Sequence, residues 1–196
     1  MGFYIHVQET PNPRAVKFIS QYTVKSEGKS NYHDPSEAEH NPLAQKLFAI
    51  GGVKQLFFFD NYITVTRTED VDWPELAEQI HDLLQTELPQ HNPAYADPQP
   101  EQAASDIEVE DTEDVRLINE ILDRTVRPYL QADGGGITVQ RREGDTVFVR
   151  YEGACGSCPS SIGGTLMAIQ SILRDELEAE IEVVETGTAG QMFPMW

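Results

Sequence analysis

The sequence predicts an α+β protein of two small α/β-type domains that are joined by an acidic, proline-containing linker. Alternating and 3.6-periodic apolar patterns occur on both sides of the middle of the chain, which indicates strands and helices in two separate places. The middle differs in composition, since residues 86–114 contain nine acidic side chains, no basic ones and four prolines. Proline and like charge disfavour a packed core. We therefore expect domains at residues 1–87 and 112–196, with a flexible linker over residues 88–111.

The first domain opens with a strand, followed by a turn that contains Pro11 and Pro13, because proline cannot donate to a strand ladder. Asn41 and Pro42 mark a helix start, since asparagine can cap a helix and proline suits its first turn. The polar residues 25–41 predict irregular chain before it. The expected elements are strands at residues 3–8, 15–19, 53–59 and 63–66, and helices from Pro42 to about residue 50 and from Asp72 to about residue 84.

The second domain has the predicted order helix, strand, strand, helix, strand. Its first helix is amphipathic from Asp114 to about Leu130, and a run of three glycines, Gly134–Gly136, breaks the chain after it. The alternation that follows is typical of a hairpin. The expected strands lie at residues 137–141, 146–151 and 181–184, and the expected second helix follows the cysteine motif and extends to about residue 177.

Charge and composition exclude several classes of function. The chain carries 33 acidic and 14 basic residues, for a formal net charge of −19, so a nucleic acid or an anionic membrane would be repelled. No apolar run reaches the length of a membrane span, and the first residues do not resemble a secretory signal. With only two cysteines, the chain is not a disulfide scaffold, and we expect a reducing, cytoplasmic location.

The two cysteines, Cys155 and Cys158, carry the chemistry that the sequence suggests. Their C-x-x-C spacing allows both thiolates to face one metal or iron–sulfur centre, but it also occurs in redox dithiols and in inert pairs. The predicted helix start at Pro159 favours thiolate over thiol, and the polar surroundings argue against inert burial. The domain is also too short, and its element order wrong, for a thioredoxin fold.

Counting ligands suggests that one chain is incomplete. A tetrahedral zinc site or a cubane cluster needs about four protein ligands, whereas one chain offers two cysteines. All five histidines precede residue 92, so none lies in the domain of the cysteine pair. Either the first domain completes the site, or two chains each contribute Cys155 and Cys158 through a two-fold axis.

Two stretches of the chain resemble a known family. The cysteine motif, residues 153–161, with the preceding Arg127–Gly135 segment, resembles the NifU-like C-terminal domain of Nfu-type iron–sulfur cluster carriers and scaffolds. Residues 10–18, 41–48, 52–54 and 62–66 resemble the Nfu N-terminal domain. The resemblance covers nearly the whole chain except the acidic linker.

The resemblance implies a protein that is not an enzyme. It implies that Cys155 and Cys158 of two chains hold a labile [4Fe–4S] cluster in a homodimer. The cluster would come from an upstream donor and pass to apo iron–sulfur client proteins. The acidic charge and the lack of a membrane span, and not the resemblance, predict no nucleic acid or membrane as partner. The residues alone leave two alternatives open: a thioredoxin-like dithiol oxidoreductase and a structural zinc-bridged dimer.

Overall fold

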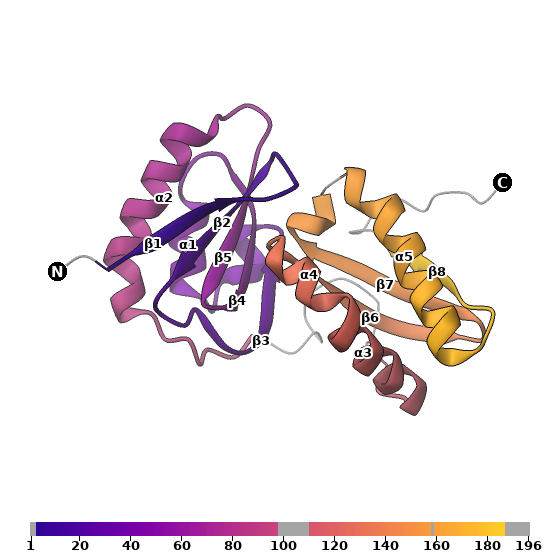
Figure 1. Ribbon diagram of the computed structural model, residues 1–196. Coiled ribbons are helices and arrows are strands. Elements are labelled where there is room, and N and C mark those ends of the chain that lie inside the picture. The colour runs from indigo at the N-terminus through magenta and orange to yellow at the C-terminus, as the bar shows by residue number, and fades with distance from the viewer. Residues whose placement is uncertain (1–2, 98–109, 158, 187–196) are drawn as a thin grey trace. The chain divides into compact units, whose positions relative to one another are not determined.

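The computed structural model describes residues 3–97, 110–157 and 159–186, and it divides into two compact units, residues 1–103 and 104–196 (Figure 1). Each unit packs helices against its own sheet and has its own hydrophobic core. The expected α+β class is therefore confirmed.

The first unit is built on a five-stranded sheet in the order β1-β2-β5-β4-β3, in which every neighbouring pair is antiparallel. The β4–β5 connection is a tight turn, in which Asp60 takes a φ of 45°. The strands are β1 (Ile5–Glu9), β2 (Ala15–Ser20), β3 (Lys25–Tyr32), β4 (Val53–Asp60) and β5 (Tyr62–Arg67).

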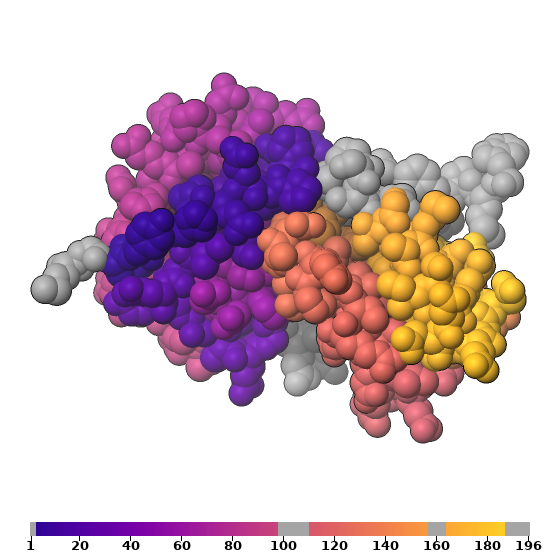
Figure 2. Space-filling view, in the orientation of Figure 1, coloured from indigo at the N-terminus to yellow at the C-terminus, as the bar shows by residue number. Residues whose placement is uncertain are grey.

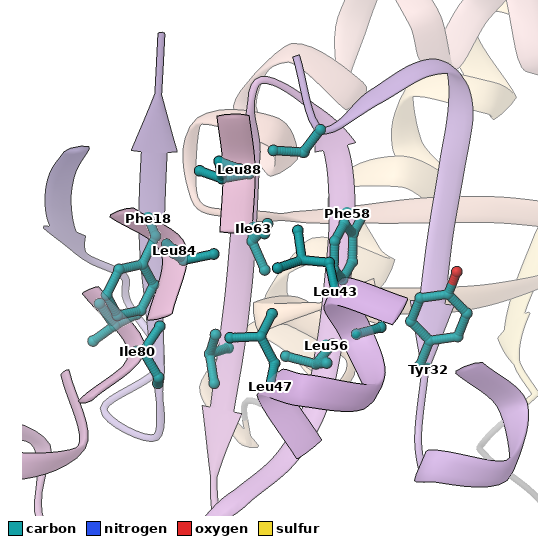
Figure 3. Packing of buried hydrophobic residues seen from close by; sticks show 14 of the residues in the cluster. Phe18, Tyr32, Leu43, Leu47, Leu56, Phe58, Ile63, Ile80, Leu84 and Leu88 are labelled. Carbon is teal, nitrogen blue, oxygen red and sulfur yellow. The ribbon is translucent and has the colours of Figure 1, made fainter. Parts of the chain in front are cut away.

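Two α-helices, α1 (Pro42–Phe48) and α2 (Trp73–Glu87), contribute to the core of this unit. Asn41 caps α1 as predicted, because its Oδ1 atom accepts a hydrogen bond from the backbone N–H of Ala44 at 3.2 Å. The core lies between these helices and the sheet (Figure 3). Two short 3-10 turns, η1 (Pro35–Ala38) and η2 (Leu88–Gln90), complete the unit.

The prediction of irregular chain over residues 25–41 is wrong, because β3 and η1 lie there. The sequence of β3, KSEGKSNY, has no apolar alternation, and Gly28 adopts a φ of 67° within it. The strand lies at the edge of the sheet and its register with β4 shifts between Lys25 and Lys29. Lysines and irregularities are common at sheet edges, and they hide the strand signal from a pattern search.

The second unit has a three-stranded sheet in the order β6-β7-β8, with β6 and β7 antiparallel and β8 parallel to β7. Helices α3, α4 and α5 contribute the other side of its core and form its visible surface in Figure 2. The elements are α3 (Glu113–Thr125), α4 (Arg127–Ala132), β6 (Gly135–Glu143), β7 (Thr146–Gly153), the 3-10 turn η3 (Ala154–Ser157), α5 (Pro159–Leu177) and β8 (Glu182–Glu185).

The single helix predicted from Asp114 to Leu130 is in fact two helices. The break falls at Val126, whose φ and ψ are −109° and −43°. Pro128 follows in the first turn of α4, where its missing N–H needs no partner. A continuous helix would have lost a hydrogen bond there, so proline sets the boundary.

The linker expected over residues 88–111 does not begin at residue 88. Leu88 is 3% exposed and belongs to the core of the first unit, and residues 91–97 lie against β3. Residues 98–109 of the expected linker lie outside the described residues. No helix in the described part of the chain is long and apolar enough to cross a membrane.

Candidate cluster-binding site

Cys155 lies in the turn η3, between the end of β7 and the start of α5. Gly153 ends the strand with a φ of 60°, which a residue with a side chain adopts less readily. Pro159 then starts α5 as predicted. The expected placement just ahead of a helix is therefore correct for Cys155, while Cys158 lies outside the described residues.

Gly135 lies against the backbone and sulfur of Cys155. A Cβ atom added to Gly135 would overlap the Cys155 Sγ atom, and it would stand 2.9 Å from the Cys155 backbone nitrogen and 2.8 Å from the Glu152 carbonyl oxygen. Atoms at such distances repel one another strongly. The position of the sulfur in this structure therefore requires glycine at residue 135.

The start of β6 and the cysteine turn are also joined through their backbones. Gly135 pairs with Gly153 in the β6–β7 ladder, and the backbone N–H of Ala154 donates to the Gly134 carbonyl oxygen at 3.2 Å. Gly134 itself has a φ of 77°. The glycine run that the sequence shows only as a chain break thus forms the support of the cysteine turn.

The close approach to Cys155 by Gly135 was not predicted from the sequence. An added Cβ atom at Gly156 would instead meet the Tyr151 carbonyl oxygen at 3.1 Å. The signal for Gly135 was present in the three consecutive glycines, since a turn alone rarely needs so many.

Cys155 is buried, with 4% of the residue exposed, and it packs into the hydrophobic core of the second unit. Among the residues whose side chains the structure describes, this thiol packs with apolar neighbours, which differs from the polar setting expected from the sequence. Burial among apolar side chains favours a neutral thiol over a thiolate. Ligation of a metal requires the thiolate, so the turn has to open or a cation has to approach before Cys155 can bind.

The neighbouring titratable groups are affected by the same burial. Burial raises the pKa of Tyr151, and the charges of Glu185 and Cys155 raise it further. Burial also raises the pKa of Glu185. Burial thus disfavours the charged forms of both side chains.

The described residues contain no group of three or more His, Cys, Asp or Glu side chains that could hold a metal ion. Of the two predicted ligands, the structure describes only Cys155, in the turn η3 after β7.

The first unit carries a groove of about 450 Å³ between the β1–β2 turn and the start of α2. The turn holds Pro11 and Pro13, and the indole Nε1 of Trp73 donates to the Pro13 carbonyl oxygen at 3.0 Å. The lining is mostly apolar, without a cluster of nucleophilic or metal-binding groups among the described residues. The groove thus offers space for binding and no evident catalytic chemistry.

Two family models match the chain. The model described as "Scaffold protein Nfu/NifU N terminal" matches residues 5–91, and the model described as "NifU-like domain" matches residues 118–184. The first match covers the sheet and helices of the first unit, and the second covers Cys155, Cys158 and most of the second unit.

Curated relatives match over almost the whole chain. The human protein named "NFU1 iron-sulfur cluster scaffold homolog, mitochondrial" is 36% identical over 184 residues, which cover 93% of this chain and 71% of that protein. Proteins of the same name from Drosophila simulans and Drosophila sechellia are 37% and 36% identical, and each match covers 94% of this chain. The chain spans 65% of the length of these two Drosophila relatives.

Solved structures match more weakly. A NifU-like protein from Saccharomyces cerevisiae is 25% identical with a TM-score of 0.45, covering 50% of this chain and 87% of that chain. Protein SAV1430 from Staphylococcus aureus is 18% identical with a TM-score of 0.38, covering 43% of this chain and 99% of that chain. Both TM-scores are below 0.5, so the assignment of the family rests on the sequence matches.

The relatives correct one expectation and confirm another. They are named mitochondrial, so the expected cytoplasmic location is wrong. The error has a simple origin, because a small number of cysteines indicates a reducing environment and not a particular compartment. The resemblance seen in the sequence is confirmed by both family models and by the human relative, and the chain belongs to the Nfu family of iron–sulfur cluster scaffold proteins.

Proposed function

We propose that two copies of this chain hold a [4Fe–4S] cluster between their Cys155 and Cys158 thiolates and deliver it to apo-proteins. The observation that carries the proposal is the position of Cys155, in the turn between β7 and α5 of a unit that matches the NifU-like model. The names of the relatives, which describe an iron–sulfur cluster scaffold, support the same class of function. The role is that of a carrier and not of an enzyme.

The number of ligands supports a dimer. A cubane cluster takes about four protein thiolates, and the chain has two cysteines. A two-fold axis through the cluster supplies four without any other ligand, and two-fold dimers are the commonest oligomers. The first unit holds all five histidines and no cysteine, so its side chains are the weaker source of ligands.

The burial of Cys155 supports a labile site. When the cluster leaves, the Cys155 thiolate takes up a proton, and the apolar core then favours the neutral thiol. The cost of charging this thiol again opposes rebinding. A site built in this way binds iron less tightly than one whose thiolates are held ready, and such a site suits cargo that has to be released.

The release step is ligand exchange without net oxidation or reduction. An acceptor thiol loses its proton and its thiolate forms a bond to iron, while the bond between the same iron and Cys155 or Cys158 breaks. The leaving thiolate accepts a proton, so protons and electrons both balance. Loading of the cluster requires an upstream donor, and its release requires an apo-protein client.

The test is anaerobic reconstitution of the full chain with iron and sulfide, followed by size-exclusion chromatography with light scattering. The proposal expects a coloured dimer with about four irons and four sulfides per two chains. Transfer is then followed by adding an apo-protein with four acceptor cysteines. Cys155→Ser and Cys158→Ser should each abolish uptake, while Ser171→Ala, on the exposed side of α5, should leave it unchanged.

Three results would overturn the proposal in different ways. A colourless chain whose cysteine pair cycles with thiols would favour a dithiol oxidoreductase. A colourless dimer that contains zinc and unfolds on chelation would favour a structural zinc site. A coloured monomer would remove the shared site and leave only a metal-binding role.

A further inference from the structure

Residues 91–97, here called the strap, follow α2 and η2 and lie against β3 (Figure 1). Their exposure alternates between half-buried and exposed, which is the pattern of an extended segment lying on a surface. The contacts with the β3 side are mostly polar. Ser26 donates from its backbone N–H to the Pro93 carbonyl oxygen at 2.9 Å, His91 Nε2 lies 2.8 Å from the Val24 carbonyl oxygen, and Tyr95 OH donates to Ser30 Oγ at 2.9 Å.

Asp97 is the most strongly held residue of the strap. Its Oδ1 atom accepts from Tyr32 OH at 2.7 Å and lies 2.7 Å from His40 Nε2. Its Oδ2 atom accepts from Ser30 Oγ at 2.5 Å and lies 3.1 Å from Lys25 Nζ. A half-buried carboxylate with four such partners is held mainly by charge-assisted hydrogen bonds.

Lys25 of β3 contacts both Asp97 and Tyr95 of the strap. Only 7% of this lysine is exposed, and its Nζ atom donates to the Tyr95 carbonyl oxygen at 2.8 Å and lies 4.0 Å from the centre of the Tyr95 ring. Removal of the Asp97 charge would leave the ammonium group covered but without its counter-charge, which is unfavourable. Movement of the strap away from β3 would return that group to water.

Besides these polar contacts, the rings of His91 and Tyr95 pack against Phe58 of the core, with ring centroids 6.4 Å apart in both pairs. None of residues 91–97 is fully buried, and none belongs to the hydrophobic core cluster of the first unit, whose last member is Leu88. A partly buried surface segment whose contacts are largely polar opens at a lower free-energy cost than the core of its domain. The contacts of Asp97 therefore decide whether the strap is attached.

We propose that the strap detaches reversibly from the first unit and that the contacts of Asp97 hold it in place. Its release lengthens the connection between the two units. Attached, the strap belongs to the first unit. Released, residues 91–97 join the connection and extend the reach of the cysteine-bearing unit by up to about 25 Å. Release also uncovers the Ser30 and Tyr32 side chains of β3. The proposal concerns the apo chain and does not rest on cluster binding.

The test compares backbone hydrogen exchange in the full apo chain with and without Asp97→Asn. We expect the protection of the strap amides to fall by about tenfold or more, while amides of β2 and β5 keep theirs. Glu78→Gln is the matched control, because Glu78 is an exposed acid on α2 that is remote in sequence from the strap. Small-angle X-ray scattering of the same chains should show a larger maximum dimension for Asp97→Asn alone.

Three outcomes would overturn the proposal. Unchanged protection of the strap amides in Asp97→Asn would show that this carboxylate does not hold the strap in place. Loss of protection throughout β2 and β5 would show that Asp97 holds the whole unit together and not the strap. Strap release without a change in maximum dimension would show that the reach of the second unit does not depend on the strap.

Discussion

Gly135 packs directly against the sulfur of Cys155, so that a single methyl group on Gly135 would overlap that sulfur. Gly135 precedes the cysteine by twenty residues and starts a different strand. The proposed ligand is therefore placed by two segments, the turn η3 that carries it and the start of β6 that leaves room for it.

Gly135→Ala should displace the thiol and the turn that carries it. Crowding of this kind in a packed region costs about 1–3 kcal/mol of the free energy of unfolding. We also expect cluster uptake on reconstitution to fall to a small fraction of the unsubstituted chain, measured as bound iron per chain. Gly51→Ala provides the control, because an added Cβ atom there meets nothing within 4 Å. Normal uptake by Gly135→Ala would show that the turn moves freely before it binds.

Cys155→Ala and Cys155→Ser should differ in stability although both lack the thiol. Cys155 is part of the core, so alanine loses packing and costs about 1 kcal/mol. Serine places a hydroxyl among apolar side chains and should cost about 1–3 kcal/mol. Urea denaturation followed by NMR at amides of α5 measures both values. If serine were as well tolerated as alanine, water would have to reach this position in the apo protein.

Acid should release the strap. Burial lowers the pKa of His91, and the charge of Lys25 lowers it further, against the Val24 carbonyl, which raises it. Burial raises the pKa of Asp97, but hydrogen bonds from Ser30, Tyr32, His40 and Lys25 outweigh it, so this pKa is also lowered. Both groups therefore take up protons more readily when the strap is free, and attachment weakens as pH falls.

The loss of attachment should begin below the ordinary histidine pKa of 6.5 and continue as Asp97 becomes protonated. Hydrogen exchange of the strap amides, corrected for intrinsic rates, measures it between pH 7.5 and pH 5. His91→Gln should flatten the upper part of this profile, while His81→Asn, on the surface of α2, should not. Protection that rises on acidification would contradict the assigned directions.

Gly164→Ala should stabilise the second unit. Gly164 lies exposed in α5, and an added Cβ atom meets nothing within 4 Å. Alanine is favoured over glycine within a helix by about 1 kcal/mol, so the free energy of unfolding should rise by roughly that amount. The measurement is urea denaturation of the apo chain at low concentration. A lower stability would reveal a neighbour that packs against this face.

Strands and helices with periodic apolar residues could be predicted from the sequence, and polar elements could not. The helices capped by Asn41 and started by Pro159 were found because capping and proline signals are local. Strand β3 and the strap were missed because both are polar, and their structure depends on contacts between residues about 65–70 positions apart. No local pattern records a pairing such as that of Lys25 with Asp97.

The candidate site was also predictable only in those parts that depend on neighbouring residues. The C-x-x-C spacing and the helix after it were evident from neighbouring residues. The burial of Cys155 and the role of Gly135 were not, because both depend on the pairing of β6 with β7. A sequence reports which atoms can bind a metal, whereas their accessibility depends on how distant segments pack.

The two edges of the five-stranded sheet are protected unequally. The strap and two lysines cover β3, whereas β1 forms the other edge among the strands that the structure describes, with Val7 42% exposed on it. An unpaired strand edge is a template for a further strand. Aggregation of this protein at high concentration should therefore start at β1, and a charged residue in place of Val7 is the substitution that should keep it dispersed.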